Sequence, residues 1–369
     1  MPLANLALRL WQELTEEIGH DLGFRRCGLI YATDDPKQLA EWDKWRAVAR
    51  RFDVKTRMLT AEEATAAVPA AGGRKWLGGV HAADDGKAEP WLAAPRIAEG
   101  ARKHGATIHQ NCAARGLDIA NGQVRGVVTE KGLIRTSAVL CAAGAWASAF
   151  LRMHAVSLPQ ASVRQTTLRT GPAPDLGGAI FTSDGALTRR IDGSYTIAAS
   201  GRATLEITPQ GIRYARPFLP MFIKRLKAVE IGISRSFFAG PETLGRWHLD
   251  RPTPFERIRV LDPAPDKRMA ASIMTQIKAL FPAVADAGIV SSWGGYIDFT
   301  PDAVPVISAV DSIGGAFVAA GCSGHGFGAG PGIGHLAADL VAGDAASVDA
   351  TPFRLSRFTD RSKMEVGAF

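Results

Sequence analysis

Residues that could do chemistry gather in a glycine-rich stretch near the C-terminus, from Gly314 to Gly343, which reads GGAFVAAGCSGHGFGAGPGIGHLAADLVAG. Its apolar start, Ala316–Ala320, predicts a buried strand. Its end predicts a helix, with Pro331 at the beginning and Gly343 after the last turn. The loop between them leaves backbone N–H groups open beside a helix N-terminus, which suits an anionic or carbonyl-rich ligand. A tight connection without a ligand is the alternative, but the entropy cost of ordering so many glycines favours the ligand.

Three motifs resemble those of the D-amino-acid oxidase (DAO) family, which includes glycine oxidase, sarcosine oxidases and D-amino-acid dehydrogenases. Residues 321–328 (GCSGHGFG) are similar to the family's C-terminal flavin-contacting segment. Residues 293–295 (WGG) and 300–302 (TPD) resemble the strand and turn before it, and residues 139–146 (VLCAAGAW) resemble the strand beside the cofactor. The motifs follow the family's order, so the resemblance implies an FAD-dependent oxidoreductase.

The resemblance also implies which residues approach the flavin. Trp146 could equally be a core aromatic, and His325 could be a structural histidine. The Gly-His-Gly-Phe match favours a role for His325 near the flavin carbonyls or the substrate, although not as a base. Tyr296 is the other catalytic candidate, and packing is its alternative role. The cofactor-binding candidates are Gly144, Trp146, Gly321, Gly324, His325, Gly326, Phe327 and Gly328.

The chemistry implied by the family is removal of a hydride from the carbon next to an amine, which gives an imine that water hydrolyses. The cofactor carries this chemistry, and the protein supplies orientation and electrostatics. An apolar pocket could keep the amine neutral without a dedicated base. No nucleophile triad is therefore expected, and the electron acceptor could be oxygen or another compound.

Substrate anchoring is where the sequence departs from the family. Members that bind an α-carboxylate often carry arginine where this chain has Ile297, and monomeric sarcosine oxidases carry lysine where it has Gly328. A guanidinium fits a carboxylate well, so Arg189, Arg190 or Arg164 is the candidate, each with a surface role as its alternative. The Trp-Gly-Gly-x-x-Asp form resembles the β subunits of multi-subunit sarcosine oxidases. No cysteine precedes it to link a flavin covalently, so noncovalent FAD is expected.

Composition narrows the class of protein. The 369 residues are 46% hydrophobic and 21% charged, with a net charge of +7 whose positive residues are scattered, so nucleic-acid binding is not expected. The four cysteines form no C-x-x-C pair, which indicates free thiols in a reducing compartment and no metal site. No apolar run reaches the ~18–20 residues of a membrane span. No secretory signal is evident, so the expected location is cytoplasmic.

The elements that must position the motifs follow from periodicity and caps. Helices are predicted over residues 2–19, 36–48 after the cap Asp35, from Thr60 onward, over about 90–105, and over 267–281 before Pro282. A strand is predicted over 27–33, a β-meander over 106–141 with turns at 121–122 and 131–132, and a hairpin around Asp192.

The resemblance implies an α/β (mixed α+β) fold: a Rossmann-like FAD-binding domain of the glutathione-reductase type with an antiparallel-sheet substrate domain. The predicted FAD domain comprises residues 79–156 and 291–348, and the substrate domain residues 1–78 and 157–290. Residues 349–369 are predicted to be a loosely packed surface tail. The N-terminal βαβ unit, with its glycine fingerprint and acidic residue for the ribose, is not found.

The predicted function is therefore FAD-dependent oxidation of the C–N bond of a small amino acid or N-alkyl amino acid. Two alternatives stay open. One is a non-catalytic fragment that cannot hold FAD, and the other is a β subunit of the sarcosine-oxidase kind that needs a partner chain.

Overall fold

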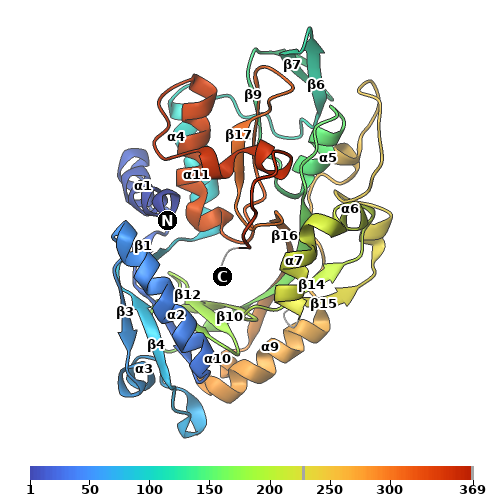
Figure 1. The fold of residues 1–369 in the computed structure, drawn as a ribbon. Helices are drawn as coiled ribbons and strands as arrows, with labels where there is room; N and C mark the ends of the chain where they lie inside the picture. Colours follow the sequence, from blue (N-terminus) through green and yellow to red (C-terminus); the bar gives the residue numbers. More distant parts are fainter. Residues whose placement is uncertain (227–228, 367–369) are drawn as a thin grey trace. The chain divides into compact units, whose positions relative to one another are not determined.

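The computed structural model describes residues 1–226 and 229–366 (Figure 1). The chain forms two compact units, each described by itself here. Unit 1 comprises Met1–Thr107, Gln165–Arg202 and Pro263–Gly295, and unit 2 comprises Ile108–Arg164, Ala203–Asp262 and Tyr296–Phe369. Both units combine helices with sheets, which confirms the predicted mixed α/β fold. The assignment of separate FAD and substrate domains, which divides the chain at other residues, stays a prediction.

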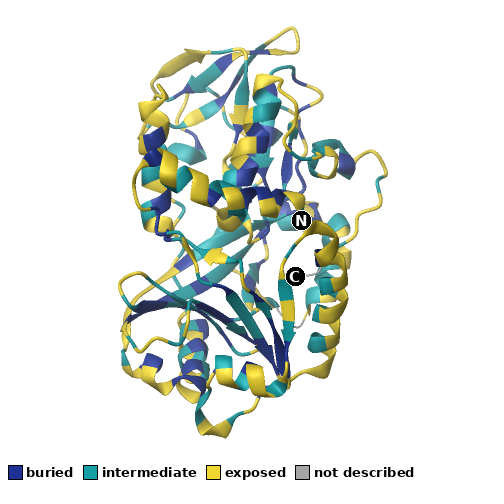
Figure 2. Cartoon of the chain, turned by 90° about the vertical axis from the view of Figure 1, so that its left-hand side faces the viewer, coloured by how far each residue is buried: buried dark blue, intermediate teal, exposed yellow. Residues whose placement is uncertain are grey.

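Two helices of unit 1 pack closely because a glycine lies between them. Helix α1 (Pro2–Ile18) ends at Gly19, whose φ of 69° is the left-handed conformation that glycine adopts most easily. Helix α4 (Pro90–Lys103) contains Pro95, as the sequence predicts. A Cβ on Gly100 would lie 2.9 Å from Ile18 Cγ1, so a larger residue would push the helices apart. Figure 2 shows the usual pattern of surface helices: residues on one side are buried (dark blue) and residues on the other side are exposed (yellow).

The sheet of unit 1 is mostly antiparallel. Its turn at Asp192 joins β12 to β13, so the predicted hairpin is confirmed. The β11–β2 pair is parallel. The strands lie in the order β10 (Ala161–Pro172), β13 (Ser194–Ala198), β12 (Ala186–Arg189), β11 (Ala179–Thr182), β2 (Leu29–Thr33), β4 (Gly78–Ala82) and β3 (Thr56–Leu59), and β1 (Arg25–Arg26) pairs with β5 (Gly86–Lys87) separately.

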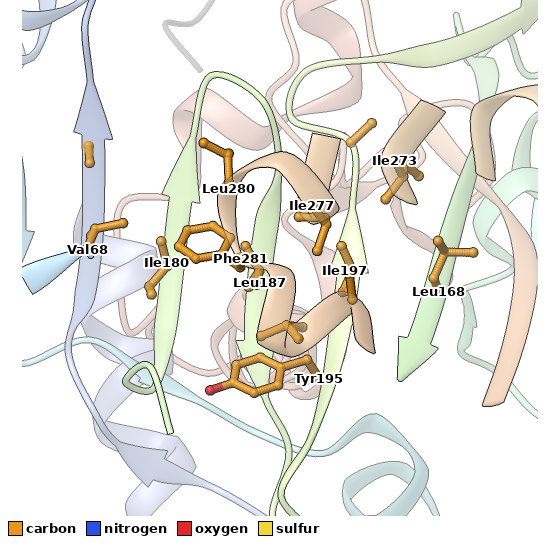
Figure 3. Close-up of a cluster of buried hydrophobic side chains, with 14 of the residues drawn as sticks. Val68, Leu168, Ile180, Leu187, Tyr195, Ile197, Ile273, Ile277, Leu280 and Phe281 are labelled. Carbon is orange, nitrogen blue, oxygen red and sulfur yellow. The ribbon is translucent and has the colours of Figure 1, made fainter. Parts of the chain in front are cut away.

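The core of unit 1 lies between this sheet and helix α9 (Lys267–Leu280). The helix buries Ile273, Ile277 and Leu280, spaced four and three residues apart on one face. Figure 3 shows these side chains pointing at residues of the strands, among them Leu168 and Ile197. Pro282 does end α9, but the chain continues at once as α10 (Pro282–Asp286), with the proline at the first helical position.

The predicted caps of two further helices in unit 1 are confirmed. The Asp35 carboxylate accepts a hydrogen bond from Lys37 N at 2.8 Å at the start of α2 (Pro36–Ala49). Thr60 and Glu63 form the reciprocal bonds of a capping box at the start of α3 (Ala61–Ala67).

Unit 2 is built on two three-stranded sheets and a short ladder. The predicted meander is the sheet of β6 (Ala114–Ala120), β7 (Gln123–Thr129) and β8 (Gly132–Arg135). The second sheet has the order β17 (Val306–Ala309), β18 (Ala316–Ala320), β9 (Val139–Cys141), with β18 and β9 parallel. Its core includes residues of β18, β9 and α5 (Ala147–Arg152). The N-terminal part of β10 pairs with β14 (Ala203–Glu206), which pairs with β15 (Val229–Gly232).

The start of the long C-terminal helix was predicted wrongly. Helix α11 spans Gly326–Ala342, so it begins five residues before Pro331 and includes most of the glycines assigned to a loop. Burial of Ile333 and Leu336, and packing of the helix against β17 and β18, outweigh the poor helix propensity of glycine. The connecting loop is correspondingly short, with His325 as the residue that caps the helix.

Part of the segment that the sequence predicts to be a loosely packed tail is packed against unit 2. The Arg357 guanidinium is 5% exposed and forms two hydrogen bonds with Asp302, at 2.8 and 3.1 Å. Leu355 and Phe358 pack against the core of unit 2. A buried ion pair that has both partners is costly to break, so residues 355–358 are an integral part of unit 2, whereas most of residues 359–366 are exposed.

Candidate functional site

The loop between β18 and α11 has a backbone that its residue types require. Gly321, Ser323 and Gly324 have φ values of 70°, 52° and 87°, a left-handed region that is cheap for glycine. A Cβ on Gly321 would lie 2.4 Å from Thr300 Cγ2, so no other residue fits there. Ser323 Oγ donates to Gly321 O at 3.1 Å and accepts from Thr300 N at 3.3 Å. These contacts fix the loop against the end of β16 (Ile289–Phe299).

A buried amide and carboxylate connect this loop to Gly144, the other predicted flavin contact. Asp298 Oδ2 accepts hydrogen bonds from Gly321 N at 2.7 Å and from Gln160 Nε2 at 2.9 Å. Gln160 Nε2 also donates to Gly144 O at 2.9 Å. Gln160 Oε1 accepts from Ser148 N at 3.0 Å, which sets the orientation of the amide. The two loops that the family resemblance assigns to the flavin are therefore held in one hydrogen-bonded assembly within unit 2.

Sequence reasoning missed Gln160 altogether. It is fully buried, and it lies outside every motif that the sequence displays. Asp298 was noted only as part of the Trp-Gly-Gly-x-x-Asp pattern, with no partner assigned. A buried glutamine needs its donors and acceptor satisfied, but a single sequence does not say by which residues.

Burial sets the ionisation of the side chains in this loop. It raises the pKa of the Asp298 carboxyl above its usual range, while the hydrogen bonds from Gly321 and Gln160 act in the opposite direction. Burial, together with the nearby charge of Asp298, raises the pKa of the Cys322 thiol to about 11, so Cys322 is a neutral and poor nucleophile. Partial desolvation lowers the pKa of His325, which makes its imidazole neutral at pH 7.

The glycines at the start of α11 are of two kinds. A Cβ on Gly326 would lie 2.8 Å from Cys322 Cβ, so packing within the protein explains that glycine. Cβ atoms on Gly328 and Gly330 would meet no atom within 4 Å, and the same is true of Gly144. A glycine inside a helix costs about 1 kcal/mol relative to alanine. No described neighbour excludes a side chain at Gly328 or Gly330, so packing within the protein does not explain these two glycines.

These features fit the flavin part of FAD. The N-terminus of a 17-residue helix carries partial positive charge, which suits the carbonyls and phosphates of such a ligand. Ala142 and Ala143, between β9 and Gly144, are exposed and present only methyl groups. The backbone at Ala142, Ala143 and Gly144 therefore offers a flat ring a surface without bulky side chains.

The predicted cofactor residues fall into this assembly to different degrees. Gly321, Gly324, His325, Gly326, Phe327 and Gly328 form one continuous loop and helix start, and Gly144 is linked to it through Gln160. Phe327 is 41% exposed. Trp146 packs edge-on against Phe255 at 5.2 Å between ring centroids and is half-buried. Its contact supports the core-aromatic alternative, and its role toward a cofactor stays a prediction.

Tyr296 and Arg164 belong to a buried polar network of unit 2. Tyr296 Oη donates to Glu206 Oε2 at 3.0 Å, and Arg164 Nε lies 3.2 Å from Glu206 Oε1. Glu242 lies in the same network, where its Oε2 accepts from Thr208 Oγ1 at 2.6 Å while Oε1 is buried without a hydrogen-bond partner. Burial raises the pKa of Glu242. The positive charge of Arg164 is therefore already paired with the buried carboxylate of Glu206.

Arg189 and Arg190 lie in unit 1 and are also paired. Arg190 lies 3.4 Å from Glu89, which is 4% exposed and which also accepts from Ile191 N at 2.9 Å. Arg189 lies 3.5 Å from Asp175, whose side chain is 64% exposed. A pair with an exposed carboxylate is weak.

In the described residues, no helix is both long and apolar enough to cross a membrane.

Comparisons with known proteins agree with the motifs. The sequence model of one protein family, described as "FAD dependent oxidoreductase" (DAO), matches residues 1–340. A 4-methylaminobutanoate oxidase (formaldehyde-forming) of Paenarthrobacter nicotinovorans is 25% identical over 360 residues, which are 97% of this chain and 39% of that protein. A sarcosine oxidase subunit beta of an Arthrobacter species is 24% identical over 95% of this chain and 75% of the relative.

The structure is similar to that of an L-amino acid deaminase from Proteus vulgaris. The TM-score is 0.88, the identity is 28%, and the match covers 96% of this chain and 84% of the deaminase. The chain nevertheless spans less than half the length of the P. nicotinovorans oxidase. What each whole relative does is therefore not carried over directly to this chain.

Proposed function

The chain belongs to the DAO family of FAD-dependent oxidoreductases, and on that premise we propose that it oxidises the C–N bond of a small amino acid or N-alkyl amino acid. The relatives above are named for acting on methylamino compounds, sarcosine and amino acids, which supports this substrate class. The observation that carries the proposal is the assembly of Gly144, the Gly321–His325 loop and the open first turns of α11, because it leaves a backbone surface for a flavin.

The chain's residues would hold the cofactor through backbone and not through charged side chains. When bound, FAD accepts the two electrons and the hydrogen removed from the carbon next to the substrate nitrogen. Gly321, Gly324 and the first turns of α11 would face the ring, and Asp298 and Gln160 would hold the loops in place. His325, neutral at pH 7, would serve as a hydrogen-bonding group and not as a cation.

We expect FAD to be bound without a covalent link. The cysteine in the loop, Cys322, has a pKa of about 11, so little thiolate is present to form a thioether.

For the substrate carboxylate we favour Arg189 over Arg164 and Arg190. Arg164 and Arg190 pair with Glu206 and Glu89, which are 5% and 4% exposed, whereas the partner of Arg189 is open to solvent. Releasing an arginine from a buried carboxylate would leave that charge unpaired, at a cost of several kcal/mol.

Likeness to a sarcosine oxidase subunit beta over 95% of this chain favours one second candidate, a catalytic subunit that acts only with a partner chain. Such a subunit would bind flavin at the same residues but would need the partner chain to form the active enzyme.

The test is reconstitution of the purified chain with FAD, removal of free FAD, and recording of the visible spectrum before and after anaerobic addition of sarcosine, D-amino acids or L-amino acids. Flavin bands near one per chain, bleached by at least one of these compounds, are expected. Acid precipitation should release the flavin into solution. Bound flavin that no compound bleaches would favour the partner-dependent subunit. A chain that stays colourless would overturn the proposal and favour the non-catalytic fragment.

A further inference from the structure

Helix α7 (Ala215–Arg225) of unit 2 turns its apolar side chains outward. Leu219 and Ile223 are 53% and 67% exposed, and Leu226, immediately after the helix, is 54% exposed. Their spacing of four and three residues places them on one face. A helix on the surface of a globular protein normally presents its polar face to solvent. No residue of α7 is buried, although Phe218, Met221 and Phe222 are partly covered.

Basic residues border this apolar face, which we call the α7 face (Leu219, Ile223 and Leu226 with Arg216 and Lys224). Arg216 and Lys224 are both exposed and lie beside the apolar stripe on the helix, and Lys224 Nζ also donates to Val366 O at 3.2 Å. The surrounding sequence has the same character, since residues 209–238 hold one acidic residue, Glu230, against the basic residues Arg213, Arg216, Lys224, Arg225, Lys227 and Arg235.

The residues that follow extend the pattern. Ile231 on β15 is 57% exposed, Ile233 is 76% exposed, and Phe238 is 82% exposed. Isolated exposed apolar residues are common on protein surfaces, but several large ones in a single basic segment mark an interaction surface.

The chemistry of the α7 face indicates which partner covers it. A second copy of the chain would bring two sets of positive charges together, which disfavours a symmetric interface. The sequence of α7, ARPFLPMFIKR, offers aliphatic groups, two phenylalanines and cations, and no neutral hydrogen-bonding side chain that would specify a protein partner. Apolar groups beside Arg and Lys match the acyl and phosphate layers of an anionic lipid surface.

We propose that the α7 face binds the surface of an anionic membrane. The helix would lie in the plane of the interface, with Leu219, Ile223 and Leu226 among the outer acyl carbons and Arg216 and Lys224 at the lipid phosphates. The helix lies on the bilayer and does not cross it.

Co-sedimentation of the full chain with vesicles tests this. Binding to phosphatidylcholine vesicles that contain phosphatidylglycerol is expected, with weaker binding to pure phosphatidylcholine and at high salt. The double variant L219Q/I223Q should bind at least about tenfold more weakly, because two aliphatic side chains no longer enter the lipid. Arg216→Gln should weaken binding only to the anionic vesicles.

The matched control is L133Q/I134Q on β8, whose side chains are 46% and 43% exposed. It should bind vesicles like the unmodified chain. All four positions are at the surface, so thermal unfolding should change little in either double variant. The proposal is overturned if the unmodified chain does not bind anionic vesicles, or if L219Q/I223Q binds them as strongly as L133Q/I134Q does. A concentration-dependent dimer that L219Q/I223Q abolishes, without vesicle binding, would assign the α7 face to a second copy instead.

Discussion

At the scale of single residues, the candidate site is defined by what the glycines do. Gly321 and Gly326 are required by protein neighbours less than 3 Å from where a Cβ would be. Gly328 and Gly330 have no such neighbour and lie in a helix, where glycine is unfavourable. Their identity therefore works against the stability of the chain alone, and we propose that a flavin approaches them closely.

Replacing Gly328 and Gly330 with alanine separates the effect of these glycines on helix stability from their effect on flavin binding. The variant G328A/G330A should raise the free energy of unfolding of the FAD-free chain by about 1–2 kcal/mol, since each alanine restores roughly 1 kcal/mol of helix propensity. The same variant should hold FAD more weakly. Urea unfolding and FAD titration measure the two quantities. Gly334→Ala, in the same helix and equally open but further from its N-terminus, is the control that should gain stability without losing FAD. If G328A/G330A binds FAD as before, the close approach does not occur there.

Arg189 gives a second prediction at this scale, and it rests on the proposed substrate class. Arg189→Gln should raise KM for an amino-acid substrate about tenfold or more with a smaller change in kcat, because a charge-assisted bond to a carboxylate contributes roughly 1.5–3 kcal/mol. Steady-state kinetics provide the measurement. The control Arg57→Gln removes another unit 1 arginine with a partly exposed partner, Glu63. A KM that is unchanged in Arg189→Gln would place carboxylate binding elsewhere.

At the scale of elements, the link between two loops is the main structural device. Asp298 at the end of β16 and Gln160 just before β10 join the β18–α11 loop to Gly144 after β9. Side chains held by several buried hydrogen bonds position a site better than loops alone. The link also explains why the Trp-Gly-Gly-x-x-Asp pattern keeps an acidic residue in an apolar setting.

Removal of the carboxylate tests this link. In Asp298→Ala the buried Gly321 N–H loses its acceptor, which costs about 1–3 kcal/mol. Both the unfolding free energy and the affinity for FAD should fall. Asp311→Ala, an exposed aspartate of unit 2, should change neither. Unchanged FAD affinity in Asp298→Ala would show that the loop keeps its shape without the link.

The network around Glu242 makes stability depend on pH. Burial raises the folded-state pKa of Glu242. A raised pKa means that its favourable contribution is complete below the ordinary glutamate value of about 4.3 and is lost as pH rises through the folded-state pKa. Glu242→Gln should therefore resemble the unmodified chain in acid and become relatively more stable as pH increases.

Thermal unfolding over a pH series measures this difference. The control is Glu230→Gln on β15, because Glu230 is exposed. If the difference in unfolding temperature between Glu242→Gln and the unmodified chain stays constant with pH, the raised pKa of Glu242 is contradicted.

Local signals in the sequence predicted α1, α2, α3, α4 and α9, the caps at Asp35 and Thr60, the meander and the hairpin at Asp192, because caps and turns depend on neighbouring residues. The start of α11 was missed because packing against β17 and β18 overrides the propensity of its glycines. The buried pair of Arg357 with Asp302 and the Gln160 link involve residues 55 and 138 positions apart. Contacts of that kind leave no local pattern.

At the scale of the whole molecule, the two units differ in what they contribute to the account. Unit 2 contains the whole Gly144–Gln160–Asp298–Gly321 assembly as well as the α7 face. Unit 1 contains Arg189 and Arg190 on a sheet covered by α9. The family, the flavin surface and the proposed membrane contact are thus independent claims, and loss of one leaves the others standing.

The central claim is that FAD lies against the backbone around His325 and Gly144. Hydrogen–deuterium exchange of the complete chain with and without FAD tests it most directly. The account predicts that FAD slows exchange in peptides covering residues 321–330 and 142–147, while β8, with its exposed Leu133 and Ile134, stays unchanged. Protection confined to other segments, or no protection in the presence of saturating FAD, would contradict it.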